Sequence, residues 1–395
     1  MTAMGSRAYL DYNASAPLTP HARAAMLAAL EDCGNASSVH AEGRLARKRI
    51  EGARSALAGV LRCEPKQVIF TSGATEAANM ALTPVLMAGG QALPVSRLFM
   101  GAGEHACILA GGRFAKTAVE SVPIGSDGLV DPDNLARQLA THDQASGAAM
   151  VAIQHANNET GVIQPLEAIG EVVRRHQAIL LVDAVQSLGK MPVNLAALHA
   201  DIAIFSAHKL GGPQGAGALV LASPALGPPA LLRGGGQENH HRAGTENVAA
   251  IAGFGAAAEN CGSDVDFSRI SRMRDSIEAQ LRTISREAGS NVGEPVFFGA
   301  AAPRLGNTSC FAVEGIRAET ALIALDLAGV AVSSGSACSS GKVGRSHVLS
   351  AMGVGNNLAS AALRVSIGRE TGEEQIGRFT AAWKDIVRRM ASAAA

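Results

Sequence analysis

The chain of 395 residues is 47% hydrophobic, contains 44 glycines and carries equal numbers of basic and acidic side chains, 34 of each. This length accommodates a large α/β domain and a smaller second domain. The balanced charge gives no electrostatic reason to expect a nucleic acid or an anionic membrane as a partner, so small-molecule chemistry is favoured.

The cysteines and the N-terminal sequence indicate a cytoplasmic protein. The six cysteines are scattered and show neither a C-x-x-C pair nor metal-ligand spacing, so we expect reduced thiols and no metal site. The N-terminus shows no basic segment followed by an apolar core, and no apolar run approaches membrane-spanning length. We therefore expect neither secretion nor membrane insertion.

The first predicted elements are a helix from Pro20 to Leu30, a second from Glu42 to Leu61, and a short strand from Val68 to Phe70. The small-residue segment Thr71–Glu76 follows and opens a third helix. Such a turn directs backbone N–H groups and hydroxyls outward at the positive end of a helix, which suits a phosphate. The alternative is an ordinary N-cap by a hydroxyl of this segment.

Two further strands end in polar side chains. The strand Leu98–Met100 leads to Glu104 and His105, and an imidazole at that edge could lie flat on a planar cofactor, although an isolated histidine is more often structural. The strand Met150–Ile153 leads to the asparagines Asn157 and Asn158, which usually make a turn but here could project a side-chain amide into the same edge. Strands that alternate with helices in this way indicate a mostly parallel sheet with one functional rim.

The next two strands carry the most informative side chains. The apolar run 178–182 ends on Asp183, and the run 202–205 ends on Ser206, His208 and Lys209. In α/β proteins this carboxyl edge is where ligands bind. A pyridoxal phosphate enzyme needs a lysine to hold the cofactor and an acid to keep its pyridine nitrogen protonated. Each half alone is a weak signal, but the two together favour that cofactor.

Two segments beyond Lys209 add candidate groups. The glycine-rich segment 234–247 contains Arg242 and Thr245, which offer a cation and a hydroxyl for an anion such as a phosphate, although such a run could be a plain flexible loop. Farther on, the Gly/Ser-rich segment 333–341 carries Cys338. Most cysteines are buried core residues, but a cysteine in such a loop suits a mobile nucleophile.

The hydrophobic pattern changes near Asp266, where a long amphipathic helix begins, followed by short strands and a C-terminal helix with Trp383 on its apolar face. We therefore predict an N-terminal arm (1–20) that contributes to the small domain and the active site. A large cofactor-binding domain (21–262) and a small α+β domain (263–395) that carries the cysteine loop would follow.

Ten segments of the chain, in this order, resemble the cysteine desulfurases, the NifS/IscS-like branch of the class V aminotransferase-fold enzymes. They are Tyr9–Pro17, Asn35–His40, Phe70–Glu76, Glu104–His105, His155–Gly161, Asp183–Gln186, Ser206–Lys209, Gly234–Asn247, Ser333–Cys338 and Leu363–Ser366. The resemblance covers nearly the whole chain. It implies a fold-type I pyridoxal 5'-phosphate-dependent transferase of the α/β class.

The resemblance also implies a role for each matching residue. Lys209 would bind the cofactor covalently, His105 would stack on its ring, and Cys338 would be the catalytic cysteine, with His105 as a proton shuttle. The implied cofactor-binding residues are Ala74, Thr75, His105, Asn158, Asp183, Gln186, Ser206, His208, Lys209 and, from the neighbouring subunit, Thr245. Asn13, Asn158 and Arg364 would hold the substrate carboxylate, for which arginine offers a bidentate pair.

The implied reaction converts L-cysteine to L-alanine and leaves the sulfur as a persulfide on Cys338. A homodimer and a sulfur-acceptor or iron–sulfur scaffold protein are the implied partners. The alternatives within pyridoxal phosphate chemistry are a selenocysteine lyase and a class V aminotransferase, and a transaminase does not need Cys338. A non-catalytic sulfur carrier with the same fold would be favoured only if Lys209 or Cys338 were missing, and both are present.

Overall fold

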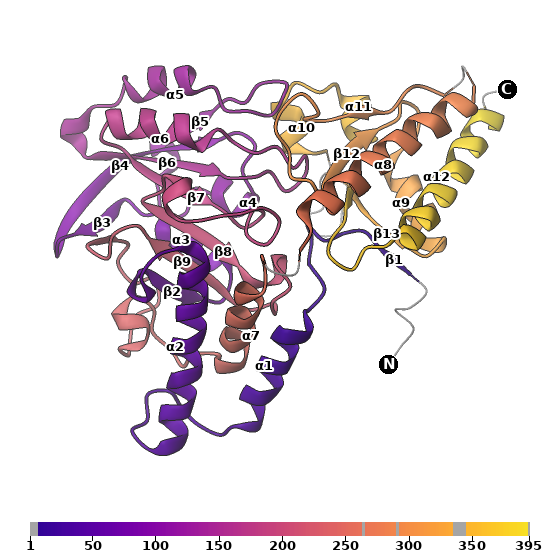
Figure 1. The fold of residues 1–395 in the computed structure, drawn as a ribbon. Helices are drawn as coiled ribbons and strands as arrows, with labels where there is room; N and C mark the ends of the chain where they lie inside the picture. The colour runs from indigo at the N-terminus through magenta and orange to yellow at the C-terminus, as the bar shows by residue number, and fades with distance from the viewer. Residues whose placement is uncertain (1–6, 263–264, 290–291, 335–344, 394–395) are drawn as a thin grey trace.

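The computed structural model describes residues 7–262, 265–289, 292–334 and 345–393 of the chain. A large α/β body and a smaller body of helices and short strands lie side by side, and the N-terminal segment passes between them (Figure 1). The expected domain boundaries after residues 20 and 262 stay a prediction.

The large body is built on a nine-stranded sheet with the order β10-β3-β4-β6-β7-β8-β9-β2, in which β5 also pairs with β4. Its strands are β2 (Val68–Thr71), β3 (Val85–Ala88), β4 (Gln91–Gly101), β5 (Val119–Val122), β6 (Ala148–Gln154), β7 (Ile179–Asp183), β8 (Ile202–Ser206), β9 (Gly217–Leu221) and β10 (Leu226–Gly227). Pairing from β4 through β6 and β7 to β8 is parallel. Strands β3 and β9 run against the others, so β2, β4, β6, β7 and β8 all end at one edge.

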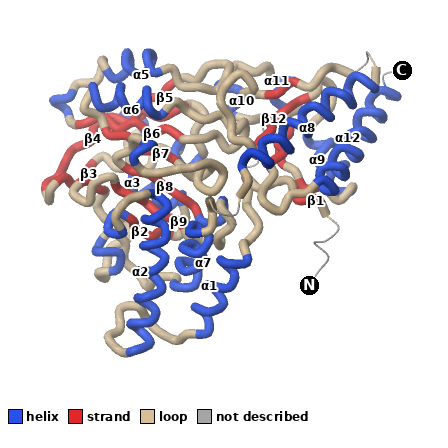
Figure 2. Tube along the Cα trace, in the orientation of Figure 1, coloured by secondary structure: helices blue, strands red, loops and turns tan. Residues whose placement is uncertain are grey.

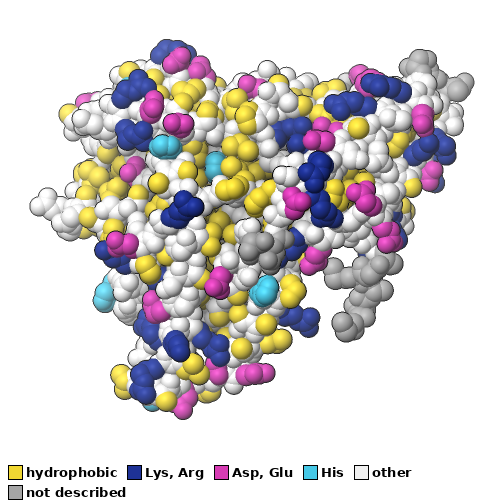
Figure 3. All heavy atoms as spheres, in the orientation of Figure 1, with side chains coloured by type: hydrophobic (Ala, Val, Ile, Leu, Met, Phe, Trp, Pro, Cys, Tyr) yellow, Lys and Arg dark blue, Asp and Glu magenta, His cyan; other side chains and the backbone are white. Residues whose placement is uncertain are grey.

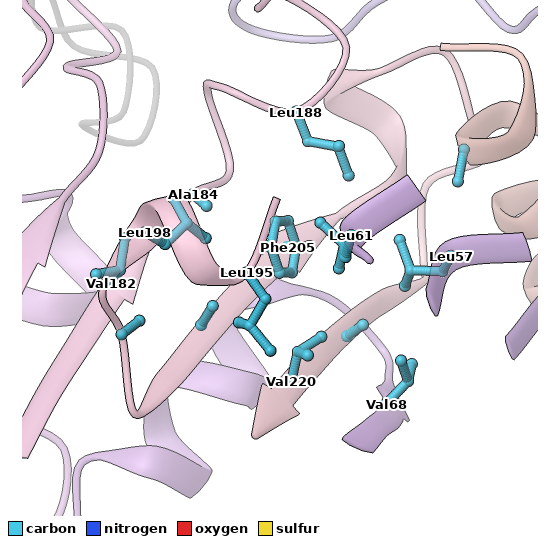
Figure 4. Packing of buried hydrophobic residues seen from close by; sticks show 14 of the residues in the cluster. Leu57, Leu61, Val68, Val182, Ala184, Leu188, Leu195, Leu198, Phe205 and Val220 are labelled. Atoms are coloured by element: carbon cyan, nitrogen blue, oxygen red, sulfur yellow. The ribbon is translucent and has the colours of Figure 1, made fainter. Parts of the chain in front are cut away.

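The central strands are buried on both faces, which explains their continuous apolar sequences. Leu180 and Val182 of β7 pack into one core cluster and Leu181 into another on the opposite face of the sheet. The first cluster also contains Phe205, Leu61 and Leu57, and Figure 4 shows Leu61 between the other two. Because these strands are fully buried, the polar residues at their ends are held in fixed positions.

Helices cover both faces of this sheet (Figure 2). They are α1 (Pro20–Glu31), α2 (Ala41–Leu61), α3 (Ala74–Ala81), α4 (Ala106–Leu109), α5 (Pro132–Leu139), α6 (Leu166–Arg175) and α7 (Val248–Glu259). The apolar residues of α2 and α7 belong to the first cluster, and those of α3 belong to the cluster on the other face.

The small body contains an antiparallel sheet of four strands, covered by helices. The strands, in spatial order, are β11 (Val296–Phe297), β12 (Thr308–Ala312), β15 (Leu363–Ser366) and β14 (Ser333–Ser334). The helices are α8 (Phe267–Glu287), α9 (Ala318–Leu327), α10 (His347–Ala351), α11 (Asn356–Ser360) and α12 (Glu373–Ala393). Trp383 of α12 is buried edge-on against Phe311, with ring centroids 5.2 Å apart. The amphipathic pattern predicted the two long helices of this body.

The N-terminal arm joins the two bodies. Strand β1 (Ala8–Tyr9) pairs in parallel with β13 (Val330–Ala331), and Asp11 forms a bridge to Ser366 at the end of β15. A few residues on, the N–H of Ala16 donates to the carbonyl of His208 at 2.8 Å. Residues 11–16 therefore lie between the small sheet and the edge of the large sheet where Lys209 stands.

The face of the molecule drawn in Figure 3 shows no single dominant charge. In Figure 3, side chains of both signs are interspersed over the visible face. Among the described residues, no helix combines the length and the apolar character that crossing a membrane requires.

Candidate active site

A cavity of about 510 Å³ opens at the edge where the parallel strands end, a size typical of small-molecule sites. It is lined by residues from the arm, from the loops after β2, β4, β6, β7 and β8, and from β15. The predicted residues that it brings together are Asn13, Ala74, Thr75, His105, Asn158, Asp183, Gln186, Ser206, His208, Lys209 and Arg364. Two predicted residues are not among them: Thr245 lines a different cavity, and Cys338 lies outside the described residues.

Lys209 stands on the turn η6 (Ala207–Lys209), directly after β8. Its Nζ donates to the carbonyls of Asn13 at 2.7 Å and Ala14 at 2.9 Å. The amine is therefore held against the N-terminal arm while it faces the cavity.

Asp183, the last residue of β7, is 7% exposed and lines the same cavity. Its Oδ1 accepts from the N–H of Val185 at 2.9 Å. Burial raises the pKa of the carboxyl, and this hydrogen bond together with the charges of His105 and Lys209 opposes the rise. A buried carboxylate of this kind can accept a hydrogen bond from a protonated ring nitrogen.

The segment after β2 forms an open helix N-terminus rather than a capped one. The N-cap of α3 is Gly73, which provides no side-chain cap, and Thr75 lies within the first turn. A Cβ on Gly217 of β9 would lie only 2.5 Å from the carbonyl carbon of Gly73, so a glycine there lets the strand pass close to this turn. The alternative interpretation of the segment as an ordinary hydroxyl N-cap is wrong, and the first turn is exposed to the cavity.

His208 and Ser206 line the same cavity as this helix N-terminus. Burial lowers the pKa of His208 to about 4, and the neighbouring Lys209 and Lys190 add to the effect. The imidazole is therefore neutral near pH 7 and can donate a hydrogen bond to an anion without carrying a charge. Its Nδ1 lies 3.3 Å from the Ser15 Oγ.

His105 caps the short helix α4, where its Nδ1 accepts from the N–H of Cys107 at 3.3 Å. The preceding Glu104 is 1% exposed, and its Oε1 accepts from the N–H of Gln154 at 2.9 Å. Burial raises the pKa of Glu104 well above its usual value. Sequence reasoning noted Glu104 only as the neighbour of His105, because no local pattern shows that its carboxyl is buried.

Arg364 brings the small sheet into the site. It is 1% exposed on β15; its Nη1 donates to the Asn158 carbonyl at 2.9 Å, and its Nη2 donates to Asp11 Oδ1 at 2.6 Å. Within the part of the chain that the structure describes, its buried Nε has no hydrogen-bond partner. A guanidinium with an unpaired buried N–H at a cavity wall is suited to receive a carboxylate.

Asn13 and Gln186 are joined by Lys190, a residue that sequence reasoning missed. The Lys190 Nζ donates to Asn13 Oδ1 at 2.8 Å and to Gln186 Oε1. Burial lowers the pKa of Lys190 well below its usual value, an effect that Lys209 and Arg364 reinforce and Asp11 opposes. The available signal was a lysine four residues after Gln186 in a segment that follows a buried strand.

Thr245 is exposed and lies in the loop that precedes α7, next to a smaller cavity lined in part by Arg242 and Glu238. The loop is anchored by Glu238, whose carboxylate accepts two 2.8 Å hydrogen bonds from Arg54 of α2. Residues 238–240 all have positive φ, from 48° to 66°. The loop is thus held in a conformation that non-glycine residues rarely adopt.

The class of protein follows from a comparison with known families. The family model described as aminotransferase class-V matches residues 8–379. The chain belongs to this family, in agreement with a cavity that combines a lysine and a carboxylate at the edge of an α/β sheet.

The relatives specify the branch. The chain is 36% identical over 382 residues to the cysteine desulfurase IscS of Dictyoglomus turgidum, covering 94% of this chain and 92% of the relative. It is 37% identical over 388 residues to a cysteine desulfurase of Cereibacter sphaeroides, covering 96% of each. Among solved structures it is similar to a NifS-like protein from Rickettsia africae, with a TM-score of 0.84 and 31% identity over 96% of this chain and 99% of the other. The predicted cysteine desulfurase family and α/β fold class are confirmed.

Proposed function

We propose that this protein is a pyridoxal phosphate-dependent cysteine desulfurase that converts L-cysteine to L-alanine and holds the released sulfur as a persulfide on Cys338. The observation that carries the proposal is that Lys209, Asp183 and Arg364 line one cavity although they come from two different sheets. The relatives named cysteine desulfurase, which match over nearly the whole chain, support it.

The residues present fit pyridoxal 5'-phosphate. Lys209 would attach it, Asp183 would face its ring nitrogen, Gln186 its phenolic oxygen and His105 its ring face. The open N-terminus of α3 with Thr75, together with Ser206 and His208, would hold the phosphate, and Thr245 would reach it from a neighbouring subunit. When bound, the cofactor supplies an electron sink for the Cα carbanion.

The residues of the chain would perform the remaining steps. Arg364 and Asn158 would hold the substrate carboxylate, with Asn13 beside them. The amine of Lys209 would take the Cα proton, and the carbonyls of Asn13 and Ala14 that it contacts provide a seat for the protonated form. His105 would receive the thiol proton of the substrate.

Sulfur transfer would then be a displacement at sulfur. The Cys338 thiolate attacks the substrate sulfur; an S–S bond forms, the Cβ–S bond breaks, and its electron pair ends on Cβ, which takes up a proton to give alanine. The thiolate is the nucleophilic form of cysteine. No external oxidant is needed, because the Cβ carbon gains the electron pair that the transferred sulfur loses.

We also propose a homodimer and delivery of the sulfur to an acceptor or an iron–sulfur scaffold protein in the cytoplasm. Support for the dimer is that Thr245 is exposed and does not line the cavity formed by its own chain. Delivery to an acceptor follows from the chemistry, because a persulfide must be unloaded before the next turnover.

The test is to incubate the purified holoenzyme with L-cysteine and to assay alanine and sulfide together. We expect equal amounts of both with reductant, and without reductant a persulfide on Cys338 that alkylation and mass spectrometry detect. Cys338→Ala should bind the cofactor normally and lose sulfur transfer. Sulfide release at the wild-type rate by this variant would favour a general lyase, and pyruvate-dependent amino transfer would favour an aminotransferase. Faster turnover of selenocysteine than of cysteine would favour a selenocysteine lyase.

A further inference from the structure

Lys190 is placed behind the cavity wall rather than in it. The residue follows β7 in the segment after Gln186 and lines a second, smaller cavity of about 60 Å³, which Lys209 also lines. Its Nζ donates to side chains of two residues that do line the main cavity, Asn13 and Gln186. The lysine can therefore influence the site without touching a ligand in it.

The two contacts of Lys190 determine which way two amide groups face. An ammonium has only donors, and a neutral amine still carries two N–H groups, so each contact places an amide oxygen against Lys190. Gln186 must then present Nε2 to its other neighbours. One N–H of this group donates to the Asn13 carbonyl at 3.1 Å. Because Gln186 lines the cavity, its second N–H is left to face a ligand bound there.

The Asn13 amide is held from every side. Its Oδ1 accepts from Lys190 at 2.8 Å and from Asn307 Nδ2 at 3.1 Å, while its Nδ2 donates to Thr308 Oγ1 at 2.9 Å and to the Asn158 carbonyl at 3.2 Å. The amide thereby uses two acceptor and two donor positions on protein groups. An amide with all four contacts made to protein groups is suited to hold its neighbouring residues in position.

The contacts of Asn13 continue to the arginine that would bind the substrate carboxylate. The Asn158 carbonyl that accepts from Asn13 also accepts from Arg364 Nη1 at 2.9 Å. On its other side, the Asn13 carbonyl accepts from both Gln186 and Lys209. Lys190 is therefore connected through one residue to both halves of the site.

We propose that Lys190 is a positioning residue: it fixes the Gln186 amide with its N–H toward the cofactor and immobilises Asn13 between Lys209 and the Asn158–Arg364 pair. The inference rests on the proposed function, because it assigns to Gln186 the ring oxygen of the cofactor. Burying an amine costs free energy unless its hydrogen bonds are made, and here the bonds that repay the cost are both made to residues of the site.

The test compares Lys190→Met, which keeps the length of the side chain but removes both of its hydrogen bonds, with Lys190→Arg, which keeps a cation with N–H donors. Lys48→Met, at an exposed position, is the control. For Lys190→Met we expect cofactor to remain bound, its visible absorption band and the pH at which that band titrates to shift, and kcat to fall roughly tenfold to a hundredfold. Lys190→Arg should retain more of the wild-type spectrum, and Lys48→Met all of it. If Lys190→Met does not fold, Lys190→Gln takes its place, because it removes the ammonium and shortens the side chain while keeping a polar end.

A double variant separates positioning from mere packing. If Lys190 acts through Gln186, then Lys190→Met added to Gln186→Met should shift the absorption band no further than Gln186→Met alone. Additive shifts, or a wild-type spectrum and kcat in Lys190→Met, would overturn the proposal. A wild-type enzyme that makes no alanine from cysteine would instead overturn the proposed function, and the spectral comparison would still be measurable.

Discussion

At the scale of single residues, the backbone of the N-terminal arm holds the amine of the site. Lys209 donates to the carbonyls of Asn13 and Ala14. Asp183 accepts from the N–H of Val185, and the charge of Lys209 opposes the rise of its pKa. Main-chain groups of two different segments therefore position the amine and the acid that we assign to the cofactor.

Glu159 gives a prediction on pH. The residue is 2% exposed beside the site, and its carboxylate accepts from the Ser346 hydroxyl at the start of α10. Burial raises its pKa from 4.5 to about 7. The folded protein therefore binds more protons than the unfolded chain between these two values, so the contribution of this group to stability is largest below pH 4.5 and is lost as the pH rises to about 7.

Glu159→Gln keeps an acceptor for Ser346 but does not titrate. Relative to wild type, we expect its free energy of unfolding to rise by roughly 3 kcal/mol at most across that pH range. Urea titrations at a series of pH values measure this difference, with Glu31→Gln at an exposed position as the control. A difference that stays constant with pH would contradict the prediction.

The residues that sequence reasoning identified and those that it missed differ in how local their signals are. Asp183 and Lys209 each end an apolar run, so the sequence around them is enough to place them at the sheet edge. The position of Lys190 in the site is apparent only from its contact with Asn13, which is 177 residues away in the chain. No local sequence pattern shows that its amine is buried. The role of Cys338 stays a prediction.

At the scale of elements, the parallel centre of the sheet and the strand β2 at one end were predictable, and the other end, formed by β3 and β10, was not. Strands β6, β7 and β8 are continuous apolar runs, which indicates strands buried on both faces. The hairpin of β3 with β4 was missed, and β4 begins at Gln91, well before the expected strand at Leu98. Its early residues are largely exposed and include Pro94, so they lack the apolar pattern of a central strand.

The anchor of the loop before α7 gives a prediction on stability. Arg54 and Glu238 are 4% and 3% exposed and form two hydrogen bonds with each other. Both also contact Phe70: Glu238 Oε2 accepts from its N–H, and the Arg54 guanidinium lies over its ring, 5.0 Å from the centroid. Arg54→Met leaves this carboxylate buried without its cation. We expect a loss of about 3–5 kcal/mol in the free energy of unfolding.

Chemical denaturation measures that loss, and an exposed pair provides the control. Arg137 lies 3.8 Å from Asp131 on the surface, so Arg137→Ala should cost less than about 1 kcal/mol. Because residues 238–240 adopt positive φ, the loop is also expected to relax once its anchor is lost. A loss in Arg54→Met as small as that in Arg137→Ala would show that the pair does not anchor the loop.

At the scale of the whole molecule, the site exists only when both bodies and the arm are in place. Asp11 of the arm pairs with Arg364 of the small sheet, and Asn13 contacts Lys190 and Lys209 of the large body. These contacts join residues far apart in the chain, so we expect the cavity to form late in folding. The sequence suggested that the arm contributes to the site, but its pairing with β13 depends on the tertiary fold.

The proposed homodimer gives the last prediction, because a cross-subunit Thr245 makes each site composite. Thr245 is exposed in its own chain, so Thr245→Asp should fold, while its carboxylate would repel the phosphate of the cofactor in the partner's site. Lys209→Ala removes the cofactor attachment in its own site. Each variant alone should lose most activity as a homodimer.

Co-expression of the two variants with different affinity tags yields heterodimers. By symmetry, one site of the heterodimer then combines an intact Lys209 with an intact Thr245, and the other site carries both changes. We expect the isolated heterodimer to recover about half of the wild-type activity per dimer, with sedimentation confirming its size. If the heterodimer is as inactive as its parents, or if Thr245→Asp alone is fully active, Thr245 does not serve the neighbouring site. A fully active monomer in sedimentation would exclude the dimer itself, since no chain could then borrow a residue from another.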